Sequence, residues 1–117
     1  MIEELVCRVF AIRNATHIAH WASKSYSEHK ALGKFYDGVI EKIDAIVEAY
    51  QGYYGLIGDV RMAVVTKGDI TAKIREDLTW INANRSKVAK GNTMMENLID
   101  DLMQLYSTTL YKLVNLK

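Results

Sequence analysis

Residues 52–69 separate two long helical patterns and read GYYGLIGDVRMAVVTKGD. The glycines at the start of this segment are typical of the position just past a helix C-terminus, and Asp69 suits a helix N-cap. Between them the apolar pattern is poor, although Val60 to Val65 could form a short helix or one extended turn. About 16 residues, fully extended, reach ~50 Å, whereas a helix of about 25 residues is ~37 Å long. The connection can therefore cross the whole length of a helical bundle.

Helical periodicity on both sides of this connection predicts four helices. The first runs from about Ile2 to Lys24, the second from about Glu28 to Gln51, the third from the N-cap Asp69 to about Lys90, and the fourth from Thr93 to the end of the chain. Proline is absent, as expected for long helices, because proline lacks the N–H and clashes with the preceding turn. The connections are short, long and short in turn. The pattern predicts an all-α fold, a ferritin-like four-helix bundle with a long crossover between the second and third helices.

Residues 1–117 are expected to form this bundle as a single domain. In the first helix Leu5, Val9, Ile12, Thr16 and Ala19 repeat at four and three, which marks the face that points to the core. A serine in the segment 25–27 can cap the second helix. Thr93 and Glu96 have the spacing of a capping box at the start of the fourth.

Histidines and carboxylates gather in the first half of the chain. The histidines are His17, His20 and His29, and the second helix then carries Asp37, Glu41, Asp44 and Glu48 at spacings of four, three and four. At ~100° per residue, this acidic row lies roughly 140° from the centre of the apolar stripe, so it points away from the subunit's own core. Imidazole and carboxylate together suit iron, zinc or manganese, although a solvated acidic face is the usual explanation for such a row.

The chain resembles the Dps-type mini-ferritins over roughly residues 14–52. The resemblance rests on the pair His20-Trp21, on His29 near the start of the second helix, and on Asp44 and Glu48 spaced by four. The end of the second helix, residues 46–52, is also similar to that family. The chain is similar as well to short Dps-like proteins of bacteriophages.

This resemblance implies a site for iron, or for another divalent metal such as zinc or manganese, between two subunits. It implies that His20 and His29 bind the metal from one subunit and that Asp44 and Glu48 bind it from the other. Ferroxidase or iron-storage activity and a homo-oligomer, at least a dimer, with a dodecamer-like shell as a larger form, belong to the same expectation. Whether the chain is an enzyme stays open.

Three departures from the family pattern bear on this expectation. Gly33 stands where the family has an aspartate four residues after the second histidine. The spacing from His20 to His29 is about three residues shorter than usual, and a basic N-terminal arm is missing, so DNA binding through such an arm is not expected. The alternative is a metal-free ferritin-like oligomer that acts as a structural or interaction module. The residues do not decide whether His17, Asp37 or Glu41 joins the site.

Composition and charge argue against nucleic-acid binding, an internal disulfide and a membrane span. The net charge of +1 gives no electrostatic footprint for nucleic acid. A single cysteine, Cys7, cannot form an internal disulfide, and no apolar run approaches the ~20 residues that span a membrane. The sequence therefore predicts a cytoplasmic protein that does not enter the membrane.

Overall fold

The computed structural model describes residues 1–62 and 68–116, and that part of the chain contains four α-helices. They are α1 (Ile2–Ala22), α2 (Tyr26–Tyr54), α3 (Ile70–Ala89) and α4 (Thr93–Asn115). The predicted four helices are confirmed, although α1 ends two residues earlier than expected and α2 extends further at both ends. Of the segment 60–65, residues 60–62 are not helical, and the others lie outside the described residues.

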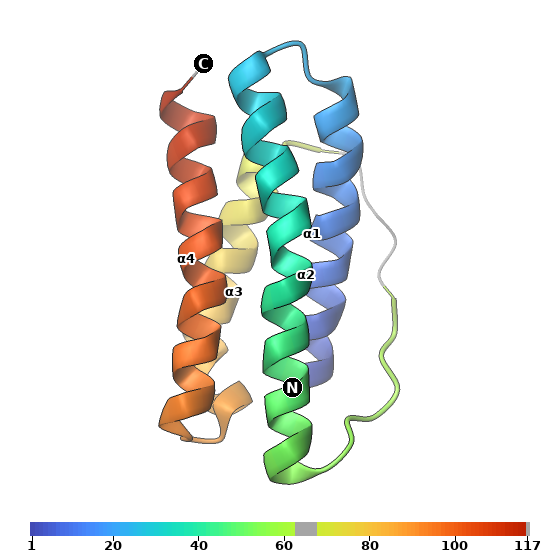
Figure 1. Ribbon diagram of the computed structural model, residues 1–117, viewed down its shortest axis with the longest axis vertical. Helices are drawn as coiled ribbons and strands as arrows, with labels where there is room; N and C mark the ends of the chain where they lie inside the picture. Colours follow the sequence, from blue (N-terminus) through green and yellow to red (C-terminus); the bar gives the residue numbers. More distant parts are fainter. Residues whose placement is uncertain (63–67, 117) are drawn as a thin grey trace.

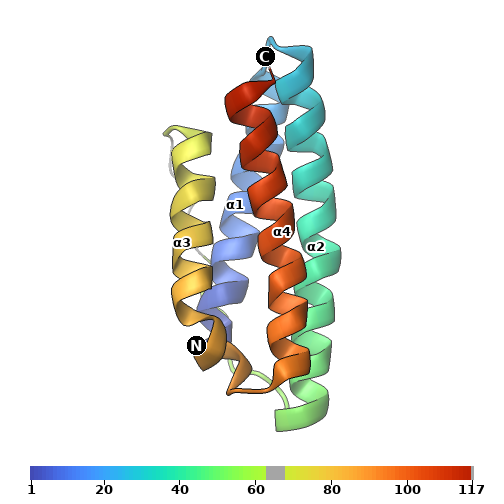
Figure 2. The same ribbon diagram turned by 90° about the vertical axis from the view of Figure 1, so that its left-hand side faces the viewer.

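The helices form a bundle in which α1 and α4 run one way and α2 and α3 run the other (Figure 1, Figure 2). Each helix packs against two antiparallel neighbours, in the order α1, α2, α4, α3 and back to α1. Because α2 ends at one end of the bundle and α3 begins near the other, the chain between them crosses its length (Figure 1). This is the single-crossover connectivity of ferritin-like bundles, as the length of the connection predicted.

Polar side chains cap α2 and α3 at their first turns. The Ser25 hydroxyl accepts a hydrogen bond from the Glu28 backbone N–H at 3.3 Å. The Asp69 carboxylate accepts one from the Thr71 N–H at 3.1 Å. Both caps satisfy a backbone donor that the helix itself leaves without a partner, and both were expected from the sequence.

The cap of α4 differs from the predicted one by one residue. Asn92, rather than Thr93, is the N-cap, and its side-chain oxygen accepts from the Met95 N–H at 3.1 Å. Glu96 is therefore not part of a capping box. Its carboxylate instead accepts from the Arg85 guanidinium at 3.1 Å, so it joins α4 to α3. The capping-box spacing was a misleading signal because asparagine caps as well as threonine does.

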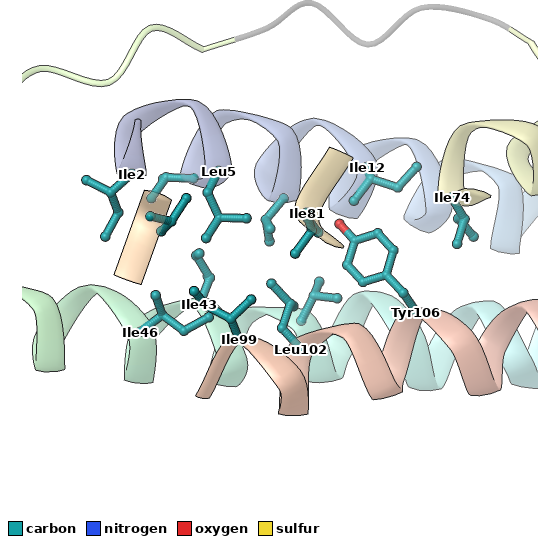
Figure 3. Packing of buried hydrophobic residues seen from close by; sticks show 14 of the residues in the cluster. Ile2, Leu5, Ile12, Ile43, Ile46, Ile74, Ile81, Ile99, Leu102 and Tyr106 are labelled. Atoms are coloured by element: carbon teal, nitrogen blue, oxygen red, sulfur yellow. The ribbon is translucent and has the colours of Figure 1, made fainter. Parts of the chain in front are cut away.

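The core lies along the bundle axis and consists mainly of branched aliphatic side chains from all four helices (Figure 3). The predicted face of α1 is confirmed at Leu5, Val9, Ile12 and Thr16, which are buried, whereas Ala19 is half-buried. The Thr16 hydroxyl donates to the Ile12 carbonyl at 2.8 Å, so this buried polar group is satisfied. Burial of each large aliphatic side chain contributes ~1.5–3 kcal/mol, which makes this core the main source of stability. No helix among the described residues is long and apolar enough to span a membrane.

A buried carboxylate interrupts this apolar core, and the sequence patterns did not predict it. Asp77 of α3 is 8 % exposed and accepts a hydrogen bond from Arg8 of α1 at 3.0 Å. Its other oxygen lies 3.5 Å from the hydroxyl of Tyr106 on α4, and the Arg8 guanidinium also lies over the Trp80 ring. Burial raises the pKa of Asp77 to about 6, although the hydrogen bond and charge of Arg8 oppose this rise. Three helices thus meet at one ionisable group.

Asp77→Asn is expected to flatten the pH dependence of stability between about pH 4 and pH 6. In that range folded Asp77 binds a proton that the unfolded chain has released, so its contribution is fully present below the ordinary value of 3.8 and is lost as pH rises through about 6. At 1.36 kcal/mol per pKa unit, the loss approaches about 3 kcal/mol. Urea unfolding of both proteins across this range measures the difference in slope, and parallel curves would contradict the prediction.

Candidate metal centre

His20 and His29 hold the end of α1 against the start of α2. Their rings stack with centroids 3.6 Å apart and planes inclined by 20°. His20 Nδ1 lies 2.6 Å from the His29 carbonyl oxygen, and His29 Nδ1 lies 2.9 Å from the His20 carbonyl oxygen. The two residues thus bond each other's backbone reciprocally. We call this pair the histidine clamp.

The clamp determines which ring nitrogen of each histidine carries the proton. A carbonyl oxygen can only accept, so each Nδ1 must donate its N–H to the facing carbonyl. In a neutral imidazole with the proton on Nδ1, the Nε2 nitrogen keeps its lone pair. Metal-binding histidines commonly have this arrangement, in which a backbone carbonyl fixes the tautomer and orients the ring. The clamp therefore leaves two Nε2 atoms with lone pairs at one end of the bundle.

Gly33 lies directly beneath the His20 ring. A Cβ at this position would be 3.0 Å from His20 Cε1 and 3.3 Å from its Nδ1. A side chain at this position, including the aspartate of the mini-ferritin pattern, would require the His20 ring to shift by a few tenths of an ångström. Glycine lets the ring lie close to α2, although glycine weakens a helix interior by ~1 kcal/mol.

His17 is not part of the clamp. Its ring stacks on Tyr36 with centroids 4.0 Å apart and an interplanar angle of 13°, and it also contacts Trp21 at 4.5 Å. The centroids of His17 and His20 are 6.5 Å apart. The three expected histidines are thus neighbours, but only two of them share reciprocal hydrogen bonds.

The four carboxylates of the second helix, Asp37, Glu41, Asp44 and Glu48, are all exposed, which confirms that the row faces away from the subunit's own core. None of them forms an ion pair with any residue that the structure describes. Asp44 follows His29 by fifteen residues on the same helix, which is about 22 Å along its axis. One chain therefore cannot bring Asp44 or Glu48 to its own histidine clamp. Within residues 1–62 and 68–116, no three potential ligands from His, Cys, Asp and Glu come together.

A half-open cleft of about 680 Å³ lies beside the clamp, where α1, α2 and α4 approach one another. Its lining contains both clamp histidines, Asp37, Lys30, Lys34 and Lys112. Three ammonium groups and one carboxylate make the cleft of a single chain unfavourable for a cation. Carboxylates from outside the chain would be needed to reverse this balance.

The bundle interior offers no alternative cation site among the described residues. Its buried carboxylate, Asp77, is already paired with the Arg8 guanidinium. A divalent ion at Asp77 would have to displace or face this fixed positive charge. A metal bound by the described residues would therefore lie on the outer face of α1 and α2.

The family of unknown function DUF5856 matches residues 20–113 of the chain. This range includes both clamp histidines, Gly33 and the whole acidic row. No curated protein and no solved structure matches the chain. The resemblance to mini-ferritins is thus not supported by a match to any protein of that kind.

Gly33→Ala is expected to open the histidine clamp, because the added methyl group would lie 3.0 Å from His20 Cε1. Gly52→Ala is the matched control, since a Cβ at that helical position meets nothing within 4 Å. Glycine to alanine in a helix gains up to ~1 kcal/mol, so Gly52→Ala should stabilise the protein and Gly33→Ala should gain less or lose stability. Denaturant unfolding gives the free energies, and ¹⁵N shifts of the imidazoles report the His20 tautomer. Equal gains with an unchanged His20 tautomer would refute the steric role of Gly33.

Proposed function

We propose that this chain, which belongs to the family of unknown function DUF5856, binds iron or a related divalent metal between two of its subunits. His20 and His29 of one subunit supply the nitrogen ligands, and Asp44 and Glu48 of the other supply the oxygen ligands. The observation that carries this proposal is the histidine clamp, whose Nδ1 hydrogen bonds leave both Nε2 lone pairs for a metal.

The ligand set favours particular metals. Imidazole nitrogen suits zinc and iron, and carboxylate oxygen suits manganese and other hard cations. A mixed set of two nitrogens and two carboxylates matches Fe(II), Zn(II) and Mn(II) better than a thiolate-preferring ion such as Cu(I). Two carboxylates also neutralise the charge of a divalent ion, so the bound ion adds no net charge to the cleft.

The geometry supports a site that two subunits share. Asp44 and Glu48 are exposed and lack ion-pair partners among the described residues, so a second subunit can use them without breaking an internal contact. Their distance from His29 along the same helix prevents them from serving their own clamp. Asp37 lines the cleft with both histidines and can bind as an additional ligand or guide the ion inward.

Fe(II) is the proposed substrate, with oxygen or a peroxide as the oxidant. The role of this chain is to hold the ion with the four ligands, to orient the imidazoles through the carbonyl hydrogen bonds, and to bring a cation to a partly desolvated place. The mini-ferritin resemblance at His20, His29, Asp44 and Glu48 and the single-crossover bundle support this chemistry. A larger shell would store the oxidised iron.

A metal-free oligomer with a structural or interaction role is the second candidate. One observation favours it: the His20 ring fills the space where an aspartate ligand would stand, above Gly33. In a metal-free protein the histidine clamp would only hold α1 against α2.

Wild-type protein is expected to bind near-stoichiometric Fe(II), Zn(II) or Mn(II), and Glu48→Ala is expected to lose it. Glu48 is exposed and forms no ion pair among the described residues, so the substitution should leave the fold intact. His29→Ala should also lose metal, whereas His17→Ala should retain it, because His17 stacks on Tyr36 and takes no part in the hydrogen bonds of the clamp. Elemental analysis and metal titration measure the four proteins. Equal metal content in His29→Ala and His17→Ala would exclude the proposed ligands.

Addition of Fe(II) to wild-type protein is expected to cause oxygen or peroxide consumption faster than in buffer alone. The excess rate should disappear in Glu48→Ala and persist in His17→Ala. An oxygen electrode or a peroxide assay provides the measurement. Metal binding without an excess rate would leave the metal site and remove the ferroxidase activity. A folded oligomer that takes up no Fe(II) would favour the structural candidate.

A further inference from the structure

One face of α2 carries eight exposed residues in a row. They are Tyr26, Lys30, Lys34, Asp37, Glu41, Asp44, Glu48 and Gly52, and all eight are exposed. At ~100° per residue they fall within a single stripe along the helix. We call this row the α2 stripe.

The charges of the α2 stripe are separated by sign along the helix. The first half carries Lys30, Lys34 and Asp37, a net charge of +1, and the second half carries Glu41, Asp44 and Glu48, a net charge of −3. None of these six side chains forms an ion pair with a described residue. Like charges at i, i+3 and i, i+4 repel each other by a few tenths of a kcal/mol within one helix. Both halves therefore lack the counter-charge that the other half would supply.

The spacing of the α2 stripe reads the same in both directions. Its successive intervals are four, four, three, four, three, four and four residues. A second copy laid antiparallel along the first therefore aligns residue with residue about a midpoint at Val39. Such a two-fold contact uses the same surface on both subunits. In this register Lys30 faces Glu48 and Lys34 faces Asp44, and each pair occurs twice.

We propose that the α2 stripe is a self-complementary docking surface for a second copy of this chain, paired antiparallel about Val39. Four ion pairs join the basic half of each stripe to the acidic half of the other. At both ends Tyr26, whose side chain is 75 % exposed, faces Gly52, where nothing stands within 4 Å of a Cβ. The ring can therefore lie against the partner's backbone. Near the two-fold axis Asp37 faces Glu41, and the repulsion between these two carboxylates opposes the pairing. The attraction within the flanking lysine–carboxylate pairs must therefore exceed this repulsion for the dimer to form.

This inference deepens the proposed function, because it specifies the surface and the register by which the second subunit docks, and it rests on that function for its chemical consequence. In the aligned register, Glu48 of one copy stands opposite Lys30, the neighbour of His29 in the sequence. A carboxylate has two oxygens and about four lone-pair positions, so Glu48 can accept from an ammonium and still offer an oxygen to a metal. The pairing itself depends on charge and shape alone.

The test measures the native mass of metal-free protein in EDTA by sedimentation, at low salt and in about 1 M NaCl, where charges are screened within ~3 Å. Wild type is expected to form dimers, or assemblies of dimers, that weaken in high salt. Lys34→Glu should raise the dimer dissociation constant about tenfold or more, since two exposed pairs become repulsive. Lys34→Glu combined with Asp44→Lys restores opposite charges and should restore the dimer. Lys42→Glu is the control, because it makes the same charge change on α2 outside the stripe.

Each outcome decides the question. Dimers that are lost in Lys34→Glu, kept in Lys42→Glu and recovered in the double variant would establish the pairing. A monomeric wild type at low salt, equal effects of the two single variants, or no recovery in the double variant would overturn it. Circular dichroism of each variant checks that the helices remain. Metal titration separates the two proposals. A dimer that binds no metal removes the metal site and leaves the pairing, whereas a metal-binding dimer that forms equally well in Lys34→Glu leaves the shared site and removes this pairing. A metal-binding monomer removes both, because Asp44 and Glu48 cannot reach the clamp of their own chain.

Discussion

The connection between α2 and α3 constrains every other contact in the bundle. It joins opposite ends (Figure 1), so α3 runs parallel to α2 and cannot form a hairpin with it. The remaining connections, residues 23–25 and 90–92, are tight turns, which make α1–α2 and α3–α4 antiparallel hairpins. Four helices under these constraints give each helix two antiparallel neighbours. The same constraint brings the C-terminal end of α4 beside the start of α2, where Ser27 donates to the Leu116 carbonyl at 2.7 Å.

The features that the sequence predicted are those with a local physical signal. Helical periodicity and the absence of proline are visible in any window, and the length of residues 52–69 bounds what the connection can span. Asp77 had no such signal, because its burial depends on Arg8, 69 positions away in the sequence. A local pattern places an aspartate on the surface by default, and only the assembled bundle reveals its partner.

The candidate site also combines features that the sequence predicted with features that it could not predict. Residue types and helical angle were enough to predict the histidines near one helix junction and an acidic row facing outward. The role of Gly33 could not be predicted, because from the sequence it reads as a lost ligand, whereas the structure places the His20 ring over it. The reciprocal hydrogen bonds of the histidine clamp could not be predicted either. Every residue has a backbone carbonyl, and the sequence does not show which carbonyl a side chain will meet. Whether Asp37 or Glu41 would contact a metal depends on surfaces beyond one chain.

A four-helix bundle can carry its ionisable groups inside the bundle or on its outer face, and in this chain most of them lie on the outer face. The half-buried Arg8 places a positive charge beside the buried Asp77, and this charge opposes a cation there. On the outer face water surrounds the carboxylates, and in that high dielectric two charges 4 Å apart interact by only ~1 kcal/mol. Exclusion of this water by a second surface would strengthen the same interactions several-fold. The near-neutral total of +1 hides a row on the outer face of α2 whose two lysines lie toward one end and whose carboxylates lie toward the other, which is the charge pattern behind the proposed antiparallel pairing.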